Sequence, residues 1–277
     1  MAAVWESHNT VAWTFASSMV VTKPTGLAVG ELMLGVINAR KPGGETINLP
    51  SGWTSIYSVV PSNGFTSQRT IYKVADSSDV AAANFTFTTT GAVDCSACIG
   101  RISGYGNINT SSNNSINNTA TSPLTTTTVT PDRASCLFVL LAGGGQSGGA
   151  STPALSGYVL TTDDPTWTEQ FEITQANAYT FGLATATRTA VTATGTASIT
   201  LGTGPVNGDY VIGLIAIAPA VSVSGTVAAT TANAYTITPM LNNTVIASVP
   251  APAINTMDFP AWTNPDKGTT TWMNPDK

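Results

Sequence analysis

The residues best suited to chemistry in this chain are few, and the first to consider are three cysteines. Cys95 and Cys98 have the spacing of a redox motif or of half a zinc site, whereas Cys136 stands alone. A structural zinc site needs four ligands, but there is no second cysteine pair and His8 is the only histidine. The segment around the pair has strand character, so residues three apart should point to opposite faces of a sheet. We therefore expect all three cysteines to be small, buried hydrophobic residues.

Four carboxylates form the densest acidic cluster. Asp163 and Asp164 are adjacent, and Glu169 and Glu172 follow shortly after them. Loop carboxylates can bind Ca²⁺, for which Asp163 and Asp164 are the candidate ligands, and a carboxylate pair could also serve a glycosidase. On a regular strand, Glu169 and Glu172 would face opposite sides of the sheet, which disfavours both ideas. We interpret these residues as solvated loop charges, and we expect no cofactor.

Two further kinds of site remain open as hypotheses. His8 could complete a Ser-His-Asp triad, but it lies in an N-terminal segment without a nucleophile elbow. Trp53, Tyr57, Trp167 and Tyr179 could stack on sugars, although aromatic residues in β-sandwiches more often belong to the core. A glycan site is therefore an alternative to a purely structural role.

Composition restricts the classes of function. Only 9% of the residues are charged, and 15 acidic residues outnumber 10 Lys and Arg, giving a net charge of -5. Acid–base catalysis depends on titratable side chains, and nucleic-acid binding depends on clustered cations, so we predict neither an enzyme nor a nucleic-acid-binding protein. The N-terminus lacks the features of a signal peptide, and no apolar run reaches the roughly 20 residues of a membrane-spanning helix, so we expect no membrane insertion.

The periodicity of the chain predicts an all-β fold. Short segments rich in Val, Ile, Thr and aromatic residues recur between Gly, Pro, Asn and Asp. The strands that we expect cover residues 11–16, 31–38, 53–59, 68–74, 84–90, 97–104, 124–130, 136–142, 158–162, 167–174, 178–186, 195–201 and 210–218. We expect residues 106–122 to form a long exposed loop and the glycine-rich residues 143–149 to form a flexible connection. This number of strands predicts a two-sheet β-sandwich or jelly roll.

The chain changes character after residue 219. We therefore divide it into a β-sandwich domain, residues 1–219, and an extended C-terminal β arm, residues 220–277. The arm ends in a repeat of the form Trp-x-Asn-Pro-Asp-Lys that begins at Trp262 and again at Trp272. In an extended chain, ten residues span roughly 33 Å, so the two tryptophans would fit two equivalent pockets on a repeating surface. We predict that they are assembly contacts and that the protein is a homo-oligomer, with a trimer as the working expectation.

Three segments of the first domain resemble a known family. They are Gly30–Ile37, Leu49–Thr54, which contains Pro50-Ser51-Gly52-Trp53, and Thr70–Asp76, which contains Tyr72-Lys73-Val74-Ala75. Together with the alternating strand from Asn84 and the ending Ala216-Ile217-Ala218-Pro219, they resemble a β-sandwich (jelly-roll-like) module of phage virion and bacterial surface proteins. The sequence departs from that pattern with Glu31 in place of Asp and Leu49 in place of the first proline. The terminal repeat is similar to repeats at the ends of phage structural proteins.

The resemblance implies a role in a virion and brings no catalytic residues. The expected function is that of a non-enzymatic structural protein of a phage-like virion, used in capsid decoration or in a tail or fibre. The expected location is the virion surface after assembly in the host cytoplasm, and the expected partners are other copies and other virion proteins. The alternative is an adhesin module that binds a host surface glycan or receptor, and a hydrolase ranks last.

Overall fold

A computed structural model describes residues 2–40, 45–61, 66–116, 122–146, 154–175, 179–202 and 208–221, and also six short strands beyond residue 224. By its internal contacts the chain divides into two units, Met1–Val221 and Ser222–Lys277. Among the described residues, no helix has the length and hydropathy required to cross a bilayer.

The first unit contains three antiparallel sheets. The first sheet has the order β1-β5-β2-β4-β3, with the bounds β1 Val4–Thr22, β5 Asn84–Ser103, β2 Leu32–Arg40, β4 Thr66–Val74 and β3 Thr54–Val59. The second has the order β10-β11-β8-β13-β6, with the bounds β10 Thr168–Gln175, β11 Tyr179–Arg188, β8 Cys136–Gln146, β13 Gly208–Pro219 and β6 Tyr105–Ile116. The third has the order β7-β12-β9, with the bounds β7 Leu124–Thr126, β12 Ala197–Leu201 and β9 Leu155–Leu160. The single helix in the described part of the chain, α1 (Ser77–Ala81), has five residues, so the predicted all-β sandwich is confirmed.

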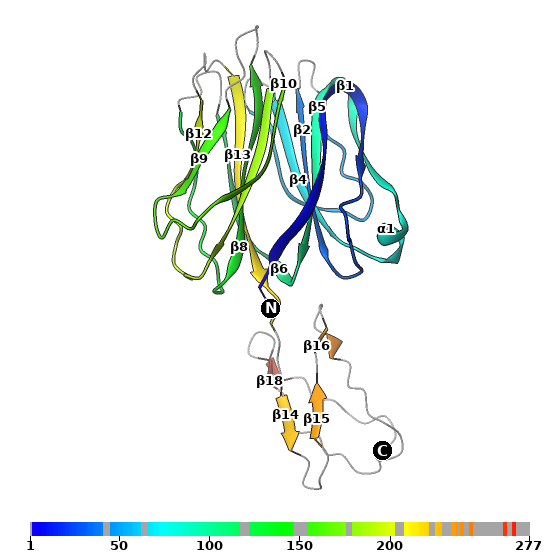
Figure 1. The fold of residues 1–277 in the computed structure, drawn as a ribbon, viewed down its shortest axis with the longest axis vertical. Helices are drawn as coiled ribbons and strands as arrows, with labels where there is room; N and C mark the ends of the chain where they lie inside the picture. Colours follow the sequence, from blue (N-terminus) through cyan, green and yellow to red (C-terminus); the bar gives the residue numbers. More distant parts are fainter. Residues whose placement is uncertain are drawn as a thin grey trace. The chain divides into compact units, whose positions relative to one another are not determined.

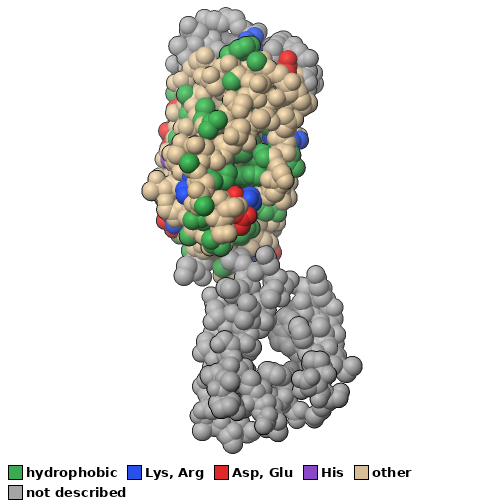
Figure 2. All heavy atoms as spheres, turned by 90° about the vertical axis from the view of Figure 1, so that its right-hand side faces the viewer, with side chains coloured by type: hydrophobic (Ala, Val, Ile, Leu, Met, Phe, Trp, Pro, Cys, Tyr) green, Lys and Arg blue, Asp and Glu red, His purple; other side chains and the backbone are tan. Residues whose placement is uncertain are grey.

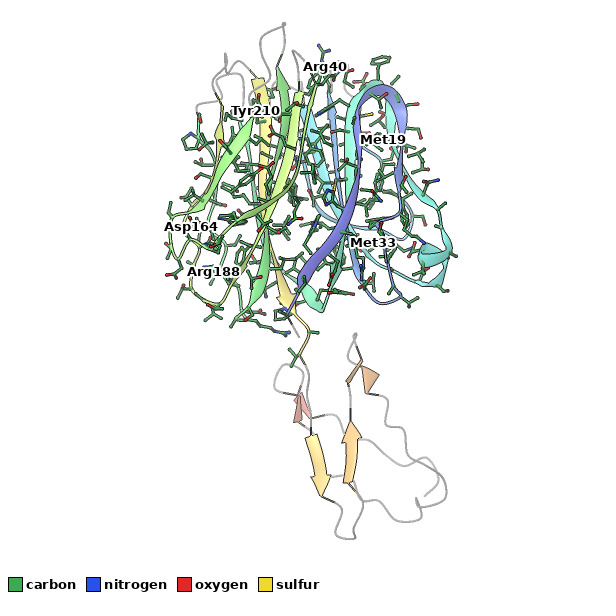
Figure 3. The ribbon with its side chains drawn as sticks, in the orientation of Figure 1. Met19, Met33, Arg40, Asp164, Arg188 and Tyr210 are labelled. Carbon is green, nitrogen blue, oxygen red and sulfur yellow. The ribbon has the colours of Figure 1, made fainter. Side chains whose placement is uncertain are left out.

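The described residues form three hydrophobic cores, two of them between the layers seen in Figure 1. One core lies between the first two sheets and contains Leu34, Leu141 and Phe181. A second core, which includes Phe138 and Ile199, lies between the second and third sheets. The third core covers the other face of the first sheet, which carries Met19 and Met33 (Figure 3). Strands such as β2, β8 and β13 are apolar on both faces because each lies between two of these cores.

The first unit consists of two halves with the same topology, which the sequence reading did not identify. In the first half, residues 2–103, the first strand pairs with the last, the last with the second, the second with the fourth and the fourth with the third. In the second half, the main-sheet strands β6, β8, β10, β11 and β13 are connected in the same way. Across the interface, β1 lies against β10, and the equivalent strand β6 lies against β3. The reciprocal contacts are those of a two-fold, isologous interface, here formed within one chain.

The ladders of the two halves also match in register. Each third main-sheet strand follows a tryptophan, Trp53 before β3 and Trp167 before β10. In each strand a register shift follows two residues later, after Ser55 in β3 and after Glu169 in β10. Ser55 and Glu169 therefore occupy equivalent positions.

Several predicted element boundaries are wrong. The strands expected at 84–90 and 97–104 are parts of one bent strand, β5, which pairs with β1 through three register shifts. The loop expected at 106–122 is strand β6 as far as Ile116, because its backbone completes the hydrogen bonds of the apolar strand β13. The connection expected from residue 143 continues β8 as far as Gln146. A Cβ on Gly143 would lie only 2.2 Å from Asn38 Oδ1, so the glycine permits a close approach of the sheets.

The described residues of the second unit form three short antiparallel pairs. They are β14 (Gly225–Ala228) with β15 (Ala234–Ile237), β16 (Pro239–Met240) with β17 (Thr244–Val245), and β18 (Thr263–Asn264) with β19 (Gly268–Thr269). In the last pair, Thr263 lies opposite Thr269 and Asn264 opposite Gly268. The spacing of roughly 33 Å expected between Trp262 and Trp272 concerns residues that lie outside the described ones, so it stays a prediction.

Candidate functional site

Glu169 and Glu172 lie on the same face of β10, which corrects the expectation that they face opposite sides. Glu169 pairs with Ala184 and Glu172 pairs with Gly182, two positions apart on β11. The register shift after Glu169 inserts one extra residue into β10. Residues three apart across this bulge, such as Glu169 and Glu172, therefore point to the same face of the sheet. Both carboxylates therefore face the third sheet, toward β9.

The two carboxylates differ in their surroundings. Glu172 Oε1 accepts hydrogen bonds from the backbone N–H of Leu155 at 2.8 Å and from the hydroxyl of Thr180 at 3.3 Å. Glu169 is exposed, and partial burial and the nearby charge of Glu172 raise its pKa. No ion pair involves either carboxylate within the described part of the chain.

Tyr158 of β9 completes this cluster and was not identified from the sequence. Its side chain is only 9% exposed, and its hydroxyl has no hydrogen-bond partner among the described residues. The hydroxyl points toward Gly182, where a Cβ would lie 3.3 Å from it. Burial, and then the charges of Glu169 and Glu172, raise the pKa of Tyr158, so the phenol is a neutral donor at physiological pH.

Trp167 lies beside Tyr158 at the entrance to β10. The centroids of the two rings are 6.5 Å apart, and their planes are inclined by 35°. The indole N–H of Trp167 donates to Asp164 Oδ1 at 3.0 Å, and the same oxygen accepts from the backbone N–H of Leu160 at 2.8 Å. Asp164 therefore fixes the orientation of a half-buried ring.

The calcium candidates Asp163 and Asp164 bind different partners. Asp163 Oδ2 forms an ion pair with the buried guanidinium of Arg188 at 3.1 Å, whereas Asp164 binds Trp167. Figure 3 shows Asp164 and Arg188 on the side of the molecule that carries β9 and β12. Among the described residues, no group of three or more His, Cys, Asp or Glu is arranged to hold a metal ion.

The other aromatic candidates are core residues. Trp53 packs edge-on against Phe85 and Phe87, and the ring of Tyr179 lies 4.7 Å from that of Trp13. Tyr57 is buried and donates to Gln68 Oε1 at 3.0 Å. Of the four aromatic candidates, Trp167 alone is half-buried rather than buried.

His8 is half-buried, and the three cysteines are buried. His8 lies in β1 near the ring of Phe171, and burial lowers its pKa. Cys95, Cys98 and Cys136 are free and fully buried, and they belong to three different cores. Cys95 and Cys98 point to opposite faces of β5, as the two-residue period of a strand predicts. The burial of all three thiols confirms the prediction that they are buried hydrophobic residues.

The assembly candidates Trp262 and Trp272 lie outside the described residues. Comparison with known proteins found no matching family model, no matching curated protein and no matching solved structure. The cluster at β9 and β10 is therefore interpreted from its own chemistry.

Proposed function

We propose that this chain is a non-enzymatic structural protein of a phage-like virion, placed in capsid decoration or in a tail or fibre. The observation that supports the proposal is that the segments that resemble the virion module form a turn, a helix cap and core contacts of the sandwich. Such a protein acts through folding and assembly, so stable layers and available edges are its functional features.

The motif around Gly52 forms a turn. The N–H of Trp53 donates to the carbonyl of Pro50 at 3.2 Å, and Gly52 has a φ of +79°, which favours glycine in the third position of a type II turn. This turn directs Trp53 into the core beside β3. The motif therefore serves the fold.

The motif that ends at Asp76 begins helix α1. The Asp76 side chain accepts hydrogen bonds from the N–H groups of Ser78 and Asp79. In return, the Asp79 side chain accepts a hydrogen bond from the N–H of Asp76, so the two residues form a capping box. Lys73 Nζ lies 2.6 Å from Asp79 Oδ1. The charged residues of this motif thus bind one another at the end of the first sheet.

The surface and the sheet edges also favour assembly. Figure 2 shows that Lys, Arg, Asp and Glu occupy only small groups on the face that carries α1. Strand β1 lies at the edge of the first sheet, and its residues Val4, Phe15 and Val20 are exposed, Phe15 by 71%. An exposed edge with apolar side chains is suited to strand addition by a neighbouring copy or another virion protein.

The test is the location of the protein in a lysate of its source cells. Antibodies raised against residues 1–221 should detect the chain in particle fractions of a density gradient, together with the major capsid protein and encapsidated nucleic acid. Mild dissociation of the particles should release it with its partners. Detection only among slowly sedimenting soluble proteins would contradict the proposal.

A further inference from the structure

The topological repeat supplies an internal comparison for the cluster at β9 and β10. Ser55 is equivalent to Glu169, and three residues later Ser58 is equivalent to Glu172. The first half forms the same bulge with two serines and without charges. The fold of this strand pair therefore does not require the carboxylates.

Glu169 also acts against the folded state. Like charges on one face repel each other, and no cation pairs with them within the described residues. Beside them the hydroxyl of Tyr158 is buried and has no partner among the described residues, and an unmade hydrogen bond at a buried donor is costly. Clusters of unsatisfied polar groups that a fold does not need are typical of binding sites.

Trp167 also differs from Trp53, its equivalent in the first half, in a way that favours a binding site. Trp53 is enclosed by Phe85 and Phe87, whereas Trp167 remains half-buried beside Tyr158. Asp164 holds its indole N–H, so the ring is oriented before any ligand arrives. An oriented aromatic ring beside hydrogen-bonding groups matches the two faces of a sugar, whose C–H groups pack on rings while its hydroxyls bind polar side chains.

We propose that Trp167, Glu169 and Tyr158 form a binding site for a neutral saccharide at the edge between β9 and β10. Trp167 packs against the sugar ring, Glu169 accepts hydrogen bonds from its hydroxyls, and the Tyr158 hydroxyl is the donor at the base of the site, directly or through one water. Glu172 stays bound to Leu155 and Thr180 and adds negative charge, which disfavours acidic sugars. The site is independent of the proposed role in a particle.

The experiment is isothermal titration calorimetry on the full chain. The probes are the hexasaccharides of the cello-, malto-, manno- and chito- series, with hexagalacturonate as the acidic counterpart. At least one neutral probe should bind with a dissociation constant below about 10 mM, and hexagalacturonate should bind more weakly. Failure of all four neutral probes, or equal binding of the acidic probe, would overturn the proposal.

Variants then locate the site. Trp167→Ala and Glu169→Ser should each weaken binding by about tenfold or more, and Glu169→Ser copies the residue that the first half carries at this position. Glu169 is exposed, so this variant should keep the fold, as its circular dichroism melt will show. The matched control is Ser55→Ala, which should leave binding unchanged. If a folded Glu169→Ser variant and Trp167→Ala both bind as the unaltered chain does, the site is wrongly assigned.

Discussion

Gly143 marks a close approach between the two halves. Asn38 Oδ1 faces it and accepts a hydrogen bond from Gln68 Nε2 at 2.8 Å, so this side chain is tied into a buried chain that continues to Tyr57. Gly143→Ala should therefore lower the free energy of unfolding by about 1–3 kcal/mol, the usual cost of overpacking a core. Urea denaturation measures the loss.

The control for this substitution is Gly91→Ala. There the nearest atom to a new Cβ is Glu45 Cγ at 3.1 Å, in a side chain that can move aside. This variant should lose well under half as much stability. Equal losses at both positions would show that the approach at Gly143 is less restrictive than its geometry indicates.

The thiols provide a second test at the residue scale. Burial raises the pKa of Cys95 to about 11 and raises the pKa values of Cys98 and Cys136. Because the thiolate is the reactive form, Ellman's reagent at pH 8 should react with none of the three in the native protein and with all three in guanidinium chloride. Rapid labelling of the native protein would mean that at least one core opens readily.

Some residue positions were predictable from spacing, and others were not. The opposite orientations of Cys95 and Cys98 follow from the two-residue period of a strand, and the structure agrees. The same rule failed for Glu169 and Glu172, because a bulge adds a residue without a distinctive sequence signal. Tyr158 gave no signal either, since its role depends on a neighbouring sheet.

At the scale of elements, an ion pair fastens the loop before β2 to β5. Arg101 donates to both oxygens of Glu31, at 2.6 and 2.8 Å, and Glu31 also accepts from the N–H of Ala28. Burial acts to raise the pKa of Glu31, but the hydrogen bonds from Arg101 and Ala28 and the charge of Arg101 outweigh it, so the pKa is lowered. The loop is thus held best when Glu31 is ionised.

This lowered pKa predicts a dependence of stability on pH. A carboxyl with a lower pKa in the folded state stabilises the protein above its unfolded value of 4.5, and the contribution disappears as pH falls through the folded pKa. Glu31→Gln should therefore be clearly less stable than the unaltered chain at pH 7, and the difference should shrink at pH 3. Urea titrations at both values measure it. A difference that stays constant with pH would exclude this ionisation as its source.

Strand β6 shows why element prediction failed in one place. Residues 106–116 are rich in Asn, which is depleted in strands, and in Ser, and they lack the apolar alternation of a typical strand. These residues form a strand because they pair with β13, whose buried backbone groups need hydrogen-bond partners. By contrast, β2, β8 and β13 were predictable because their apolar runs require burial on both faces.

At the scale of the whole molecule, the repeated topology was hidden because the two halves share backbone register far more than residue identity. Trp53 and Trp167 mark equivalent positions, but Ser55 and Glu169 differ in charge. The two halves have the same strand order and the same register of backbone hydrogen bonds but different side chains, so the similarity is visible only in the backbone pairing. The predicted sandwich of residues 1–219 is therefore made of two similar halves that share a central core.

The last prediction concerns the segment after this sandwich. Truncation after Val221 keeps the hydrogen bond from the N–H of Ala220 to the carbonyl of Gly104 at 2.8 Å, so the first unit retains its final strand intact. We expect the truncated chain to keep the β-sheet circular dichroism spectrum of the full chain but to be a monomer in light scattering, whereas the full chain is an oligomer. The physical reason is that isolated two-stranded pairs, such as the three among the described residues of this segment, are only marginally stable alone, so we expect the segment to bind neighbouring copies.

A full-length variant with Trp262→Ala and Trp272→Ala separates the tryptophans from the rest of the segment. Each tryptophan can bury up to about 250 Å², so losing both should weaken assembly even though the segment is present. Two anchors act together through avidity, and either single substitution should therefore have a smaller effect than the pair. An oligomer that survives truncation after Val221 would place assembly in the sandwich, with the exposed edge of β1 as the first surface to mutate, at Phe15.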